Sequence, residues 1–324
     1  MLSISQYREA ITNYLSEKVV VKKPENLYEP MVYILKQGGK RLRPVLVLMA
    51  TEIFDGDHRK ALDAALAIEI FHNFSLVHDD IMDDAPLRRG MKTVHEKWDL
   101  NTGILSGDAM LINAYQLFEN YEGDIFKQLA KLFTKTAIEV CEGQQYDIDF
   151  ETRDYVSIED YLLMIEYKTA VLVGASLQMG AIIAETSEDC KNAIYQYGRL
   201  LGIAFQLQDD YLDAFGDPKT FGKQSGGDII ENKKTFLYLK TLEAANDSEA
   251  QQLQHLYSIS PGDNSAKIEA VKSLFESSGA AEMTRNEIKK YTEKAFSVLE
   301  KINIPAEKKE PLNKFGMMLM EREV

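Results

Sequence analysis

The sequence predicts an all-α protein, and three observations carry this prediction. Apolar residues recur every three or four positions over long stretches, as at Leu62, Ala65 and Leu66, or at Phe133 and Ala137, which is the spacing of one helix face. Alternation with a period of two, which is typical of strands, is almost absent. The eight prolines separate helix-length segments instead of interrupting them. We therefore expect a chain of helices joined by short turns.

Four segments of the chain, 58–85, 101–121, 124–149 and 187–215, exceed the usual helix length. Their apolar residues surround most of each helix, so we expect them to form the buried centre of a helix bundle. A further helix is expected to begin near Ser157. The stretch 244–267 is polar and rich in turn formers, which favours a surface connection between shorter helices. One domain over residues 1–324 fits this pattern.

Composition excludes several classes of partner. The chain has 324 residues, a formal net charge of -14 and a pI near 5.0, which argues against nucleic acid because phosphate backbones select basic surfaces. Cys141 and Cys190 stand apart without CxxC spacing and are interpreted as core residues in a reducing compartment. Arg8 and Glu9 come too early for a secretory signal, and no apolar run reaches the length of a membrane span. We expect a soluble cytoplasmic protein.

Two aspartate clusters with the same spacing, Asp79-Asp80-x-x-Asp83 and Asp209-Asp210-x-x-Asp213, lie 130 positions apart. On a helix the first and last aspartate of each cluster share a face. Carboxylates that bind together with substrate phosphates are the usual environment of Mg²⁺ in proteins. The pair predicts a divided magnesium site. Either cluster alone could equally be a solvated helix end.

Basic residues accompany the first cluster. Lys40, Arg41 and Arg43 lie between a glycine pair and Pro44, which suits the first turn of a helix, and this arrangement predicts a seat for an anion. An exposed basic turn is the alternative. Arg88 and Arg89 follow the aspartates closely, as a diphosphate site requires. Arginines that only neutralise neighbouring carboxylates would give the same pattern.

Further donors occur at helical or loop positions. His72 lies two turns before Asp79 and could donate to an anion, although most such histidines are satisfied core residues. His78 has the same ambiguity and is left out of the candidate site. Lys168 and Thr169 fall in the helical stretch after Ser157.

In the second half, Gln206 precedes Asp209 by nearly one turn. Lys223 lies in a glycine-bearing segment, and Lys233 follows soon after it. Such a flap could close over phosphates, or it could be a mobile surface loop. The chain has no GxxxxGK[ST], GxSxG or HExxH motif, so nucleotide hydrolysis, serine esterase chemistry and zinc proteolysis lose support.

These residues together resemble the trans-type isoprenyl diphosphate synthases, the polyprenyl synthetase family. The match runs from residue 38 to residue 238 and comprises six motifs in order: Gly38 to Pro44, His72 to Gly90, Gly107 to Ala109, Lys168-Thr169, Phe205 to Asp213, and Lys223 to Thr235. The resemblance implies an isoprenoid synthase-type bundle of antiparallel helices around a central cavity, in a homodimer. It also implies condensation of isopentenyl diphosphate with an allylic diphosphate.

The resemblance assigns roles to individual residues. It implies three Mg²⁺ ions, two at Asp79 and Asp83 and one at Asp209, with supporting carboxylates at Asp80, Asp84, Asp210 and Asp213. Contacts to the allylic substrate would come from Arg88, Lys168, Thr169, Gln206, Lys223 and Lys233. The isopentenyl diphosphate seat would consist of Lys40, Arg43, His72 and Arg89.

The family pattern also bears on product length. A bulky residue five positions before the first aspartate shortens the cavity, and here that residue is Phe74, so a product of 15 or 20 carbons is expected. Three alternatives remain. A class I terpene cyclase shares the fold, but the second cluster and the basic seat favour condensation. A non-catalytic subunit of a heteromeric synthase would tend to lose aspartates, and a helical Mg²⁺-binding scaffold would leave the basic residues unexplained.

Overall fold

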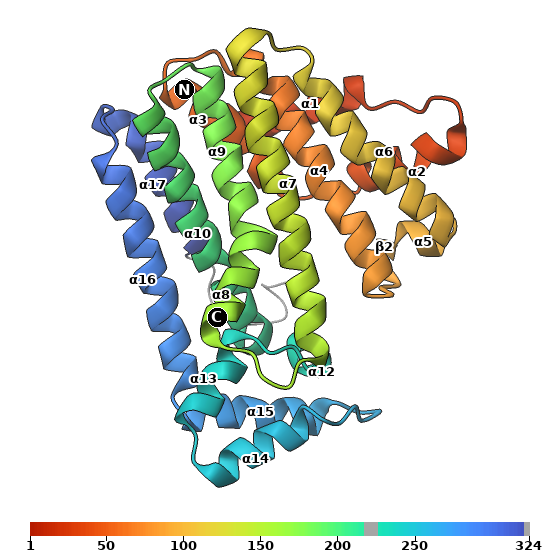
Figure 1. The fold of residues 1–324 in the computed structure, drawn as a ribbon, viewed down its shortest axis with the longest axis vertical. Coiled ribbons are helices and arrows are strands. Elements are labelled where there is room, and N and C mark those ends of the chain that lie inside the picture. The colour runs from red at the N-terminus through yellow and green to blue at the C-terminus, as the bar shows by residue number, and fades with distance from the viewer. Residues whose placement is uncertain (217–225, 321–324) are drawn as a thin grey trace. The chain divides into compact units, whose positions relative to one another are not determined.

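The computed structural model describes residues 1–216 and 226–320. Helices form nearly all the regular structure in this part of the chain (Figure 1). The strands found there are β1 (Leu87–Arg88) and β2 (Met91–Lys92), which form an antiparallel hairpin with two residues in each strand. The prediction of an all-α protein is confirmed.

The chain divides into two compact units, each described by itself. Unit 1 comprises Met1–Thr134 and Ala175–Asn192, and unit 2 comprises Lys135–Gly174 and Ala193–Val324. Three helices contribute residues to both units: α7 (Gly123–Thr152), α9 (Val171–Ile183) and α10 (Glu188–Phe215).

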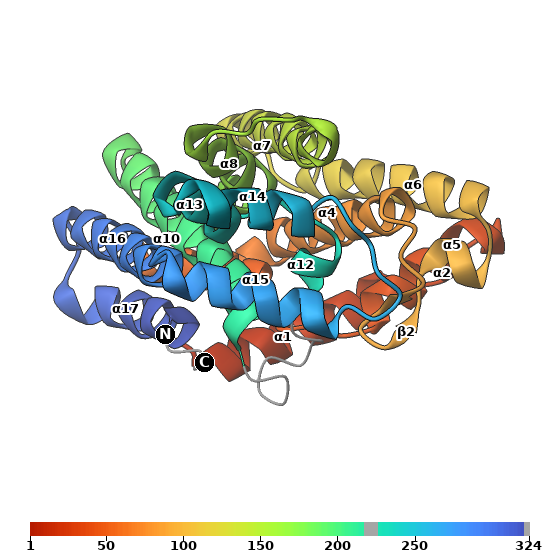
Figure 2. The ribbon, with the colours of Figure 1, turned by 90° about the horizontal axis from the view of Figure 1, so that it is seen from below.

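Unit 1 is organised around α4 and α6, which lie side by side in both ribbon views (Figures 1 and 2). The other elements of this unit, besides its parts of the shared helices, are α1 (Ile4–Lys18), α2 (Glu25–Lys36), α3 (Leu42–Ile53), η1 (His58–Ala61), α4 (Leu62–Met82), the hairpin, α5 (Val94–Lys97) and α6 (Leu100–Phe118). α4 is buried on nearly all sides from Ala64 to Phe71. It ends at the first aspartate cluster, because Asp83 caps it and Asp84 adopts a left-handed conformation with φ 48°.

Unit 2 contains the remaining helices of residues 1–216 and 226–320. They are α8 (Ile158–Ile165), η2 (Glu166–Ala170), α12 (Gly227–Ile230), α13 (Phe236–Ala244), α14 (Asp247–Leu256), α15 (Ser265–Ser277), α16 (Ala280–Lys301) and α17 (Ala306–Met320). α8 begins as predicted, since the Ser157 side chain accepts from the N–H of Asp160 and that carboxylate accepts from the N–H of Ser157. The long segments expected at 58–85, 101–121, 124–149 and 187–215 are confirmed as helical, in η1 with α4, and in α6, α7 and α10. The expectation that all four are buried is wrong for α6 and α7, since Leu105 and Ile138 are 59% and 56% exposed.

Three further expectations are wrong. The prolines do not all separate helices, since Pro30 lies inside α2 and Pro311 inside α17. Residues 244–267 are not only a surface connection, because α14 occupies much of the segment; Asn246 and Glu249 form a capping box that starts it. The cysteines are not core residues, since Cys141 is exposed and Cys190 is half-buried, and both are free thiols. No helix in the described ranges combines the length and apolarity that crossing a bilayer would require.

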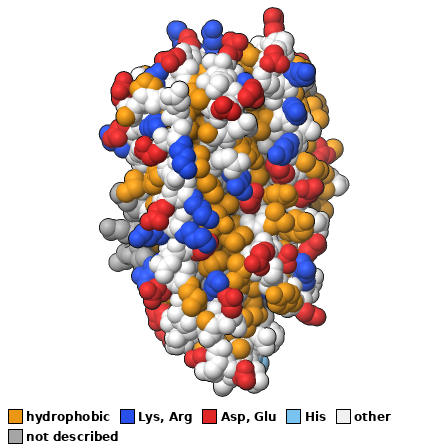
Figure 3. All heavy atoms as spheres, turned by 60° about the vertical axis from the view of Figure 1, so that its left-hand side comes forward, with side chains coloured by type: hydrophobic (Ala, Val, Ile, Leu, Met, Phe, Trp, Pro, Cys, Tyr) orange, Lys and Arg blue, Asp and Glu red, His pale blue; other side chains and the backbone are white. Residues whose placement is uncertain are grey.

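Acidic and basic side chains are interspersed on the face seen in Figure 3, with hydrophobic side chains between them. Such mixed charge is ordinary for a protein surface. Exposed charge on that face therefore does not mark a ligand site, and the candidate site is identified from contacts among named residues.

Candidate active site

A group of basic residues in unit 1 surrounds the glycine pair Gly38-Gly39. Both glycines have positive φ, 81° and 126°, a conformation that favours glycine. Arg89 donates from Nη1 to the carbonyl oxygen of Gly38, and a Cβ added to Gly39 would lie 3.1 Å from Arg89 Nη2. The glycines thus let the backbone lie against the guanidinium. Lys40 follows directly and is exposed.

His72 and Arg43 belong to the same group. Arg43 Nη1 lies 3.4 Å from His72 Nε2; a guanidinium can only donate, so Nε2 is the acceptor and Nδ1 carries the hydrogen. Burial, followed by the charges of Arg43 and Arg89, holds the pKa of His72 well below its ordinary value. A neutral histidine therefore lies among fixed positive charges, an arrangement suited to an anion.

Arg41 has a different position from its neighbours. It is buried, forms an ion pair with the buried carboxylate of Glu69 and donates to the carbonyl oxygen of Leu35. In the Gly38 to Pro44 motif, Arg41 is therefore a structural cation, because its charge is neutralised by a buried carboxylate.

The first aspartate cluster lies at the end of α4. Asp79 is half-buried in the last turn and Asp83 is exposed at the cap, where its N–H donates to the Asp79 carbonyl at 2.9 Å. Asp80 is buried and held by Arg88, whose Nε lies 2.8 and 2.9 Å from the two carboxylate oxygens and whose Nη2 lies 2.7 Å from Oδ1. Asp80 therefore binds Arg88 instead of facing solvent, and this ion pair fixes the orientation of the Arg88 guanidinium.

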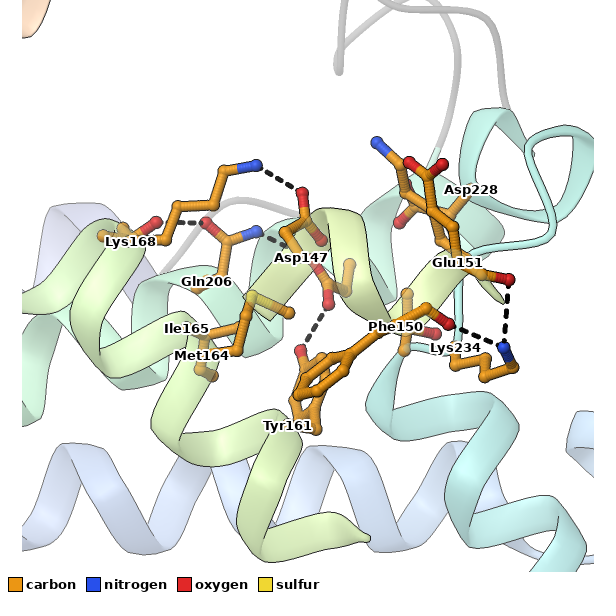
Figure 4. A pocket seen from close by; sticks show the side chains of 14 residues that line it. Asp147, Phe150, Glu151, Tyr161, Met164, Ile165, Lys168, Gln206, Asp228 and Lys234 are labelled. Atoms are coloured by element: carbon orange, nitrogen blue, oxygen red, sulfur yellow. Dashed lines mark hydrogen bonds and ion pairs between the residues drawn. The ribbon is translucent and has the colours of Figure 1, made fainter. Parts of the chain in front are cut away.

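Unit 2 contains a polar pocket of about 110 Å³. Figure 4 shows side chains from several helices converging on it. The lining residues are Asp147, Phe150, Glu151, Tyr161, Met164, Ile165, Lys168, Thr169, Gln206, Asp210, Asp228, Lys233, Lys234 and Thr235. The predicted residues Lys168, Thr169, Gln206 and Lys233 are thus brought to one pocket, next to the second aspartate cluster on α10.

A chain of hydrogen bonds fixes Asp210 in this pocket. Thr169 donates from its hydroxyl to Gln206 Oε1 at 3.0 Å, and Gln206 Nε2 donates to Asp210 Oδ1 at 2.8 Å. The buried Tyr161 hydroxyl donates to the other oxygen, Oδ2. Burial raises the pKa of Asp210 to about 6, although both donors act to lower it. Both carboxylate oxygens of Asp210 accept hydrogen bonds from protein donors. Asp210 therefore has a fixed position in the buried part of the cluster, next to the half-buried Asp209.

Lys168 and Thr169 lie in η2, a π-helix that joins α8 to α9. π-helical turns are rare and often occur at functional sites. Close approach of α7 is possible here because residue 143 is glycine, where a Cβ would lie 2.2 Å from the backbone nitrogen of Lys168. That approach allows Asp147 of α7 to form an ion pair with Lys168 (Figure 4).

The segment after α12 supplies the remaining lysines. Lys233 pairs with Glu231 at 2.9 Å, whereas Lys234 donates to the carbonyl oxygens of Phe150 and Arg153, at 2.6 and 2.9 Å. Lys234 therefore caps the carboxyl end of α7. The candidate Lys223 lies outside the described residues.

Among the residues of the unit 2 pocket that sequence reasoning missed are Tyr161 and Asp147, which hold Asp210 and Lys168 in place. Tyr161 lies seven positions before Lys168, two helical turns away, so a reading of that helix face would have found it. Asp147 lies 21 positions before Lys168, and no local spacing connects the two. Its position follows only from the packing of α7 against η2.

The carboxylates suit a magnesium ion that arrives with its ligand. In residues 1–216 and 226–320, no three His, Cys, Asp or Glu side chains form a closed metal site. Each cluster nevertheless offers oxygen donors on one face of a helix, and Mg²⁺ commonly binds through one or two carboxylates plus phosphate oxygens and water. The donor set therefore fits Mg²⁺ shared with a phosphorylated substrate.

Known proteins are similar to this chain in sequence and fold. The chain is 53% identical to a geranylgeranyl pyrophosphate synthase of known crystal structure, with a TM-score of 0.96 and 100% of each chain covered. It is 38% identical to the geranylfarnesyl diphosphate synthase of Natronomonas pharaonis, over 87% of this chain and 86% of that one. The structure of geranylgeranyl pyrophosphate synthase from Corynebacterium glutamicum, complexed with isoprenyl diphosphate and magnesium, matches at 27% identity and a TM-score of 0.87, covering 99% of this chain and 98% of that one.

The predicted isoprenoid synthase-type fold is confirmed by these structural matches. The polyprenyl synthetase family model matches residues 24–275, which include both aspartate clusters and the basic group of unit 1. The chain therefore belongs to the polyprenyl synthetase family.

Proposed function

We propose that the protein is a Mg²⁺-dependent prenyltransferase that condenses isopentenyl diphosphate with an allylic diphosphate to give a short-chain trans-prenyl diphosphate and diphosphate. One observation in unit 1 carries the proposal. A seat made only of basic and neutral donors, Arg43, His72 and Arg89, adjoins a carboxylate cluster through the neighbouring pair Arg88–Asp80. Two diphosphates that bind by different chemistry, one directly and one through a metal, would need this combination.

The two substrates follow from the two kinds of donor. Lys40, Arg43, His72 and Arg89 would hold isopentenyl diphosphate, whose diphosphate stays attached throughout. Asp79, Asp83 and Asp209 would hold three Mg²⁺ ions, whose positive charge would stabilise the allylic diphosphate as a leaving group. Asp80 and Asp210 are tied to protein donors and would keep the metal-binding carboxylates in place.

The polar pocket of unit 2 would contact the allylic diphosphate. Lys168, Thr169, Gln206 and Lys233 line it, and Lys223 joins them in the proposal on sequence grounds. Fixed cations near a leaving group stabilise it as the C–O bond breaks. Lys168 is oriented by Asp147, and Gln206 by Thr169.

Incubation with Mg²⁺, isopentenyl diphosphate and one allylic primer at a time tests the proposal, with product chain length as the readout. We expect elongation of the dimethylallyl and geranyl primers, with farnesyl diphosphate as a possible third. No elongation with any primer would refute the proposal. A cyclic hydrocarbon formed from farnesyl diphosphate alone would show a terpene cyclase instead.

Product length is proposed from Phe74, which is 8% exposed and lies on α4 five residues before Asp79. A bulky ring there favours a product of 15 or 20 carbons. The relatives include enzymes named as geranylgeranyl and as geranylfarnesyl diphosphate synthases, so the primer series is to be analysed up to 25 carbons.

The active form is proposed to be a homodimer in which residues 1–324 of each chain act as one domain. The family model spans parts of both units. On α6, Leu105 and Ile112 lie seven residues apart on one helix face and are 59% and 58% exposed, an apolar face that a second copy of the chain could cover. Size-exclusion chromatography with light scattering tests this, and Leu105→Glu with Ile112→Glu should give monomers.

Action in the cytoplasm remains a prediction, which the free thiols of Cys141 and Cys190 support.

A further inference from the structure

His78, which the proposed function does not use, contacts Phe74 and α6 in unit 1, where Asp108 Oδ1 lies 4.0 Å from its Nε2. It immediately precedes Asp79 on α4 and lies one turn after Phe74. Its ring meets the Phe74 ring in a T-shaped contact, with centroids 4.8 Å apart and an interplanar angle of 68°. Its Nε2 lies 3.2 Å from the carbonyl oxygen of Ile104 on α6. A carbonyl oxygen only accepts, so Nε2 carries the hydrogen.

α6 leaves room for this ring at Gly107. A Cβ added there would lie 2.2 Å from His78 Nε2 and 2.5 Å from Cδ2. Real Cβ atoms do not approach that closely, so any larger residue would displace the imidazole. α4 and α6 lie side by side (Figures 1 and 2). The absence of a side chain at Gly107 leaves space between them for the His78 ring.

A rigid aromatic cluster backs Phe74. Phe71 lies behind it at a centroid distance of 5.5 Å, and Phe133 lies 5.1 Å from Phe71 and 5.1 Å from Phe118. Phe71, Phe118 and Phe133 are fully buried, whereas the His78 side chain is 20% exposed. Close-packed buried rings move little. Of the two rings that contact Phe74, Phe71 is therefore the fixed one, and His78 is the one that can move.

We propose that His78 is a positioning residue that determines product length by holding the Phe74 ring in place. The inference rests on the proposed function, in which Phe74 limits the growing prenyl chain. Without the imidazole, the Phe74 ring gains room to rotate, and the obstruction to chain growth weakens.

The test measures product distributions of full-length variants with isopentenyl diphosphate and one primer. H78A should raise the ratio of the next longer product to the wild-type product by roughly 2- to 10-fold, the range that loss of one aromatic contact implies. G107A should give the same shift, because it expels the ring without removing it. In the double variant the shift should not exceed that of either single change, since both act through the same contact.

G103A is the matched control. Gly103 lies one turn earlier on α6, and a Cβ there would meet Ile81 of α4 at 2.9 Å instead of His78. It perturbs the same pair of helices, and its product distribution should equal that of the wild type. A shift in G103A equal to that in G107A would overturn the inference, because general disturbance of the helix pair would then explain both.

Unchanged product distributions in H78A and G107A, with or without a lower Tm, would also overturn it, since His78 would then be merely structural. The product distribution of F74A shows whether the role of His78 or the proposed role of Phe74 has failed. If F74A lengthens the product while H78A and G107A do not, the role of His78 fails and the proposed function stands. If the wild-type protein elongates no primer, the proposed function itself fails.

Discussion

Tyr161 donates its hydroxyl hydrogen to the buried carboxylate of Asp210, next to Asp209 of the second aspartate cluster. The hydrogen bond joins α8 to α10, and Gln206 satisfies the other carboxylate oxygen at 2.8 Å. Asp210 therefore has a fixed position before any substrate binds. Preorganised carboxylates of this kind hold metal-binding neighbours without reorganisation during the reaction.

Tyr161→Phe should impair both stability and catalysis. Loss of the donor leaves a buried carboxylate oxygen unsatisfied, which costs about 1 to 3 kcal/mol. We expect a lower Tm and a fall in kcat at saturating substrate, because Asp209 loses its fixed support. Steady-state kinetics and thermal unfolding measure the two effects.

Tyr197→Phe is the control for this change. Tyr197 is also a buried tyrosine of unit 2, and it donates to the Leu312 carbonyl oxygen at 2.8 Å. It does not line the pocket, so its loss should lower the Tm with little effect on kcat. Equal losses of kcat in both variants would show that Tyr161 acts through overall stability alone.

Arg89→Gln should weaken the binding of isopentenyl diphosphate selectively. Arg89 lies against Gly39, and its charge, like that of Arg43, lowers the pKa of His72, so its removal takes one cation from the seat. Loss of charge-assisted hydrogen bonds predicts a rise in the KM for isopentenyl diphosphate of roughly 10- to 100-fold. The KM for the allylic primer should change much less.

Arg59→Gln is the matched control, because Arg59 pairs with Asp57 at the surface with 77% of its side chain exposed. Its KM values should equal those of the wild type. Equal rises in both KM values for Arg89→Gln would contradict a separate isopentenyl diphosphate seat.

His72 predicts a dependence of stability on pH. Burial, then the charges of Arg43 and Arg89, hold the pKa of His72 well below its ordinary value in the folded protein, whereas its pKa in the unfolded chain is about 6.5. As the pH falls through that value, the unfolded state takes up a proton that the folded state does not, so the free energy of unfolding decreases. At about pH 5.5 this contribution amounts to about 1.4 kcal/mol.

Tm measured at about pH 7.5 and about pH 5.5 checks this sign, because the decrease should be smaller in His72→Gln than in the wild type. His255→Gln, at an exposed position on α14, should leave the pH dependence unchanged. An identical decrease in wild type and His72→Gln would show that other groups account for acid sensitivity.

Local spacing explains what could be predicted from the sequence. The positions of α6, α7 and α10 follow from apolar periodicity, and the aspartate clusters follow from the four-residue repeat of a helix face; both signals lie within one element. Arg41 could not be told apart from Lys40 and Arg43 because its partner, Glu69, lies 28 positions away. The role of Asp147 could not be predicted for the same reason, since only the packing of α7 against η2 brings its carboxylate to Lys168.

The two aspartate clusters are predicted to serve one allylic diphosphate, and a double-mutant cycle tests this directly. Asp79→Asn and Asp209→Asn each remove a charge that would bind Mg²⁺, so each should lower kcat strongly and raise the Mg²⁺ concentration required for half-maximal rate. If both act on one leaving group, the double variant should be little worse than the more impaired single variant, because residues that act as a unit are not additive. Asp189→Asn, at an exposed position on α10, controls for loss of charge from that helix. Fully multiplicative losses would mean that the clusters bind separate ligands, and a wild-type Mg²⁺ requirement in Asp209→Asn would remove the second cluster from the metal site.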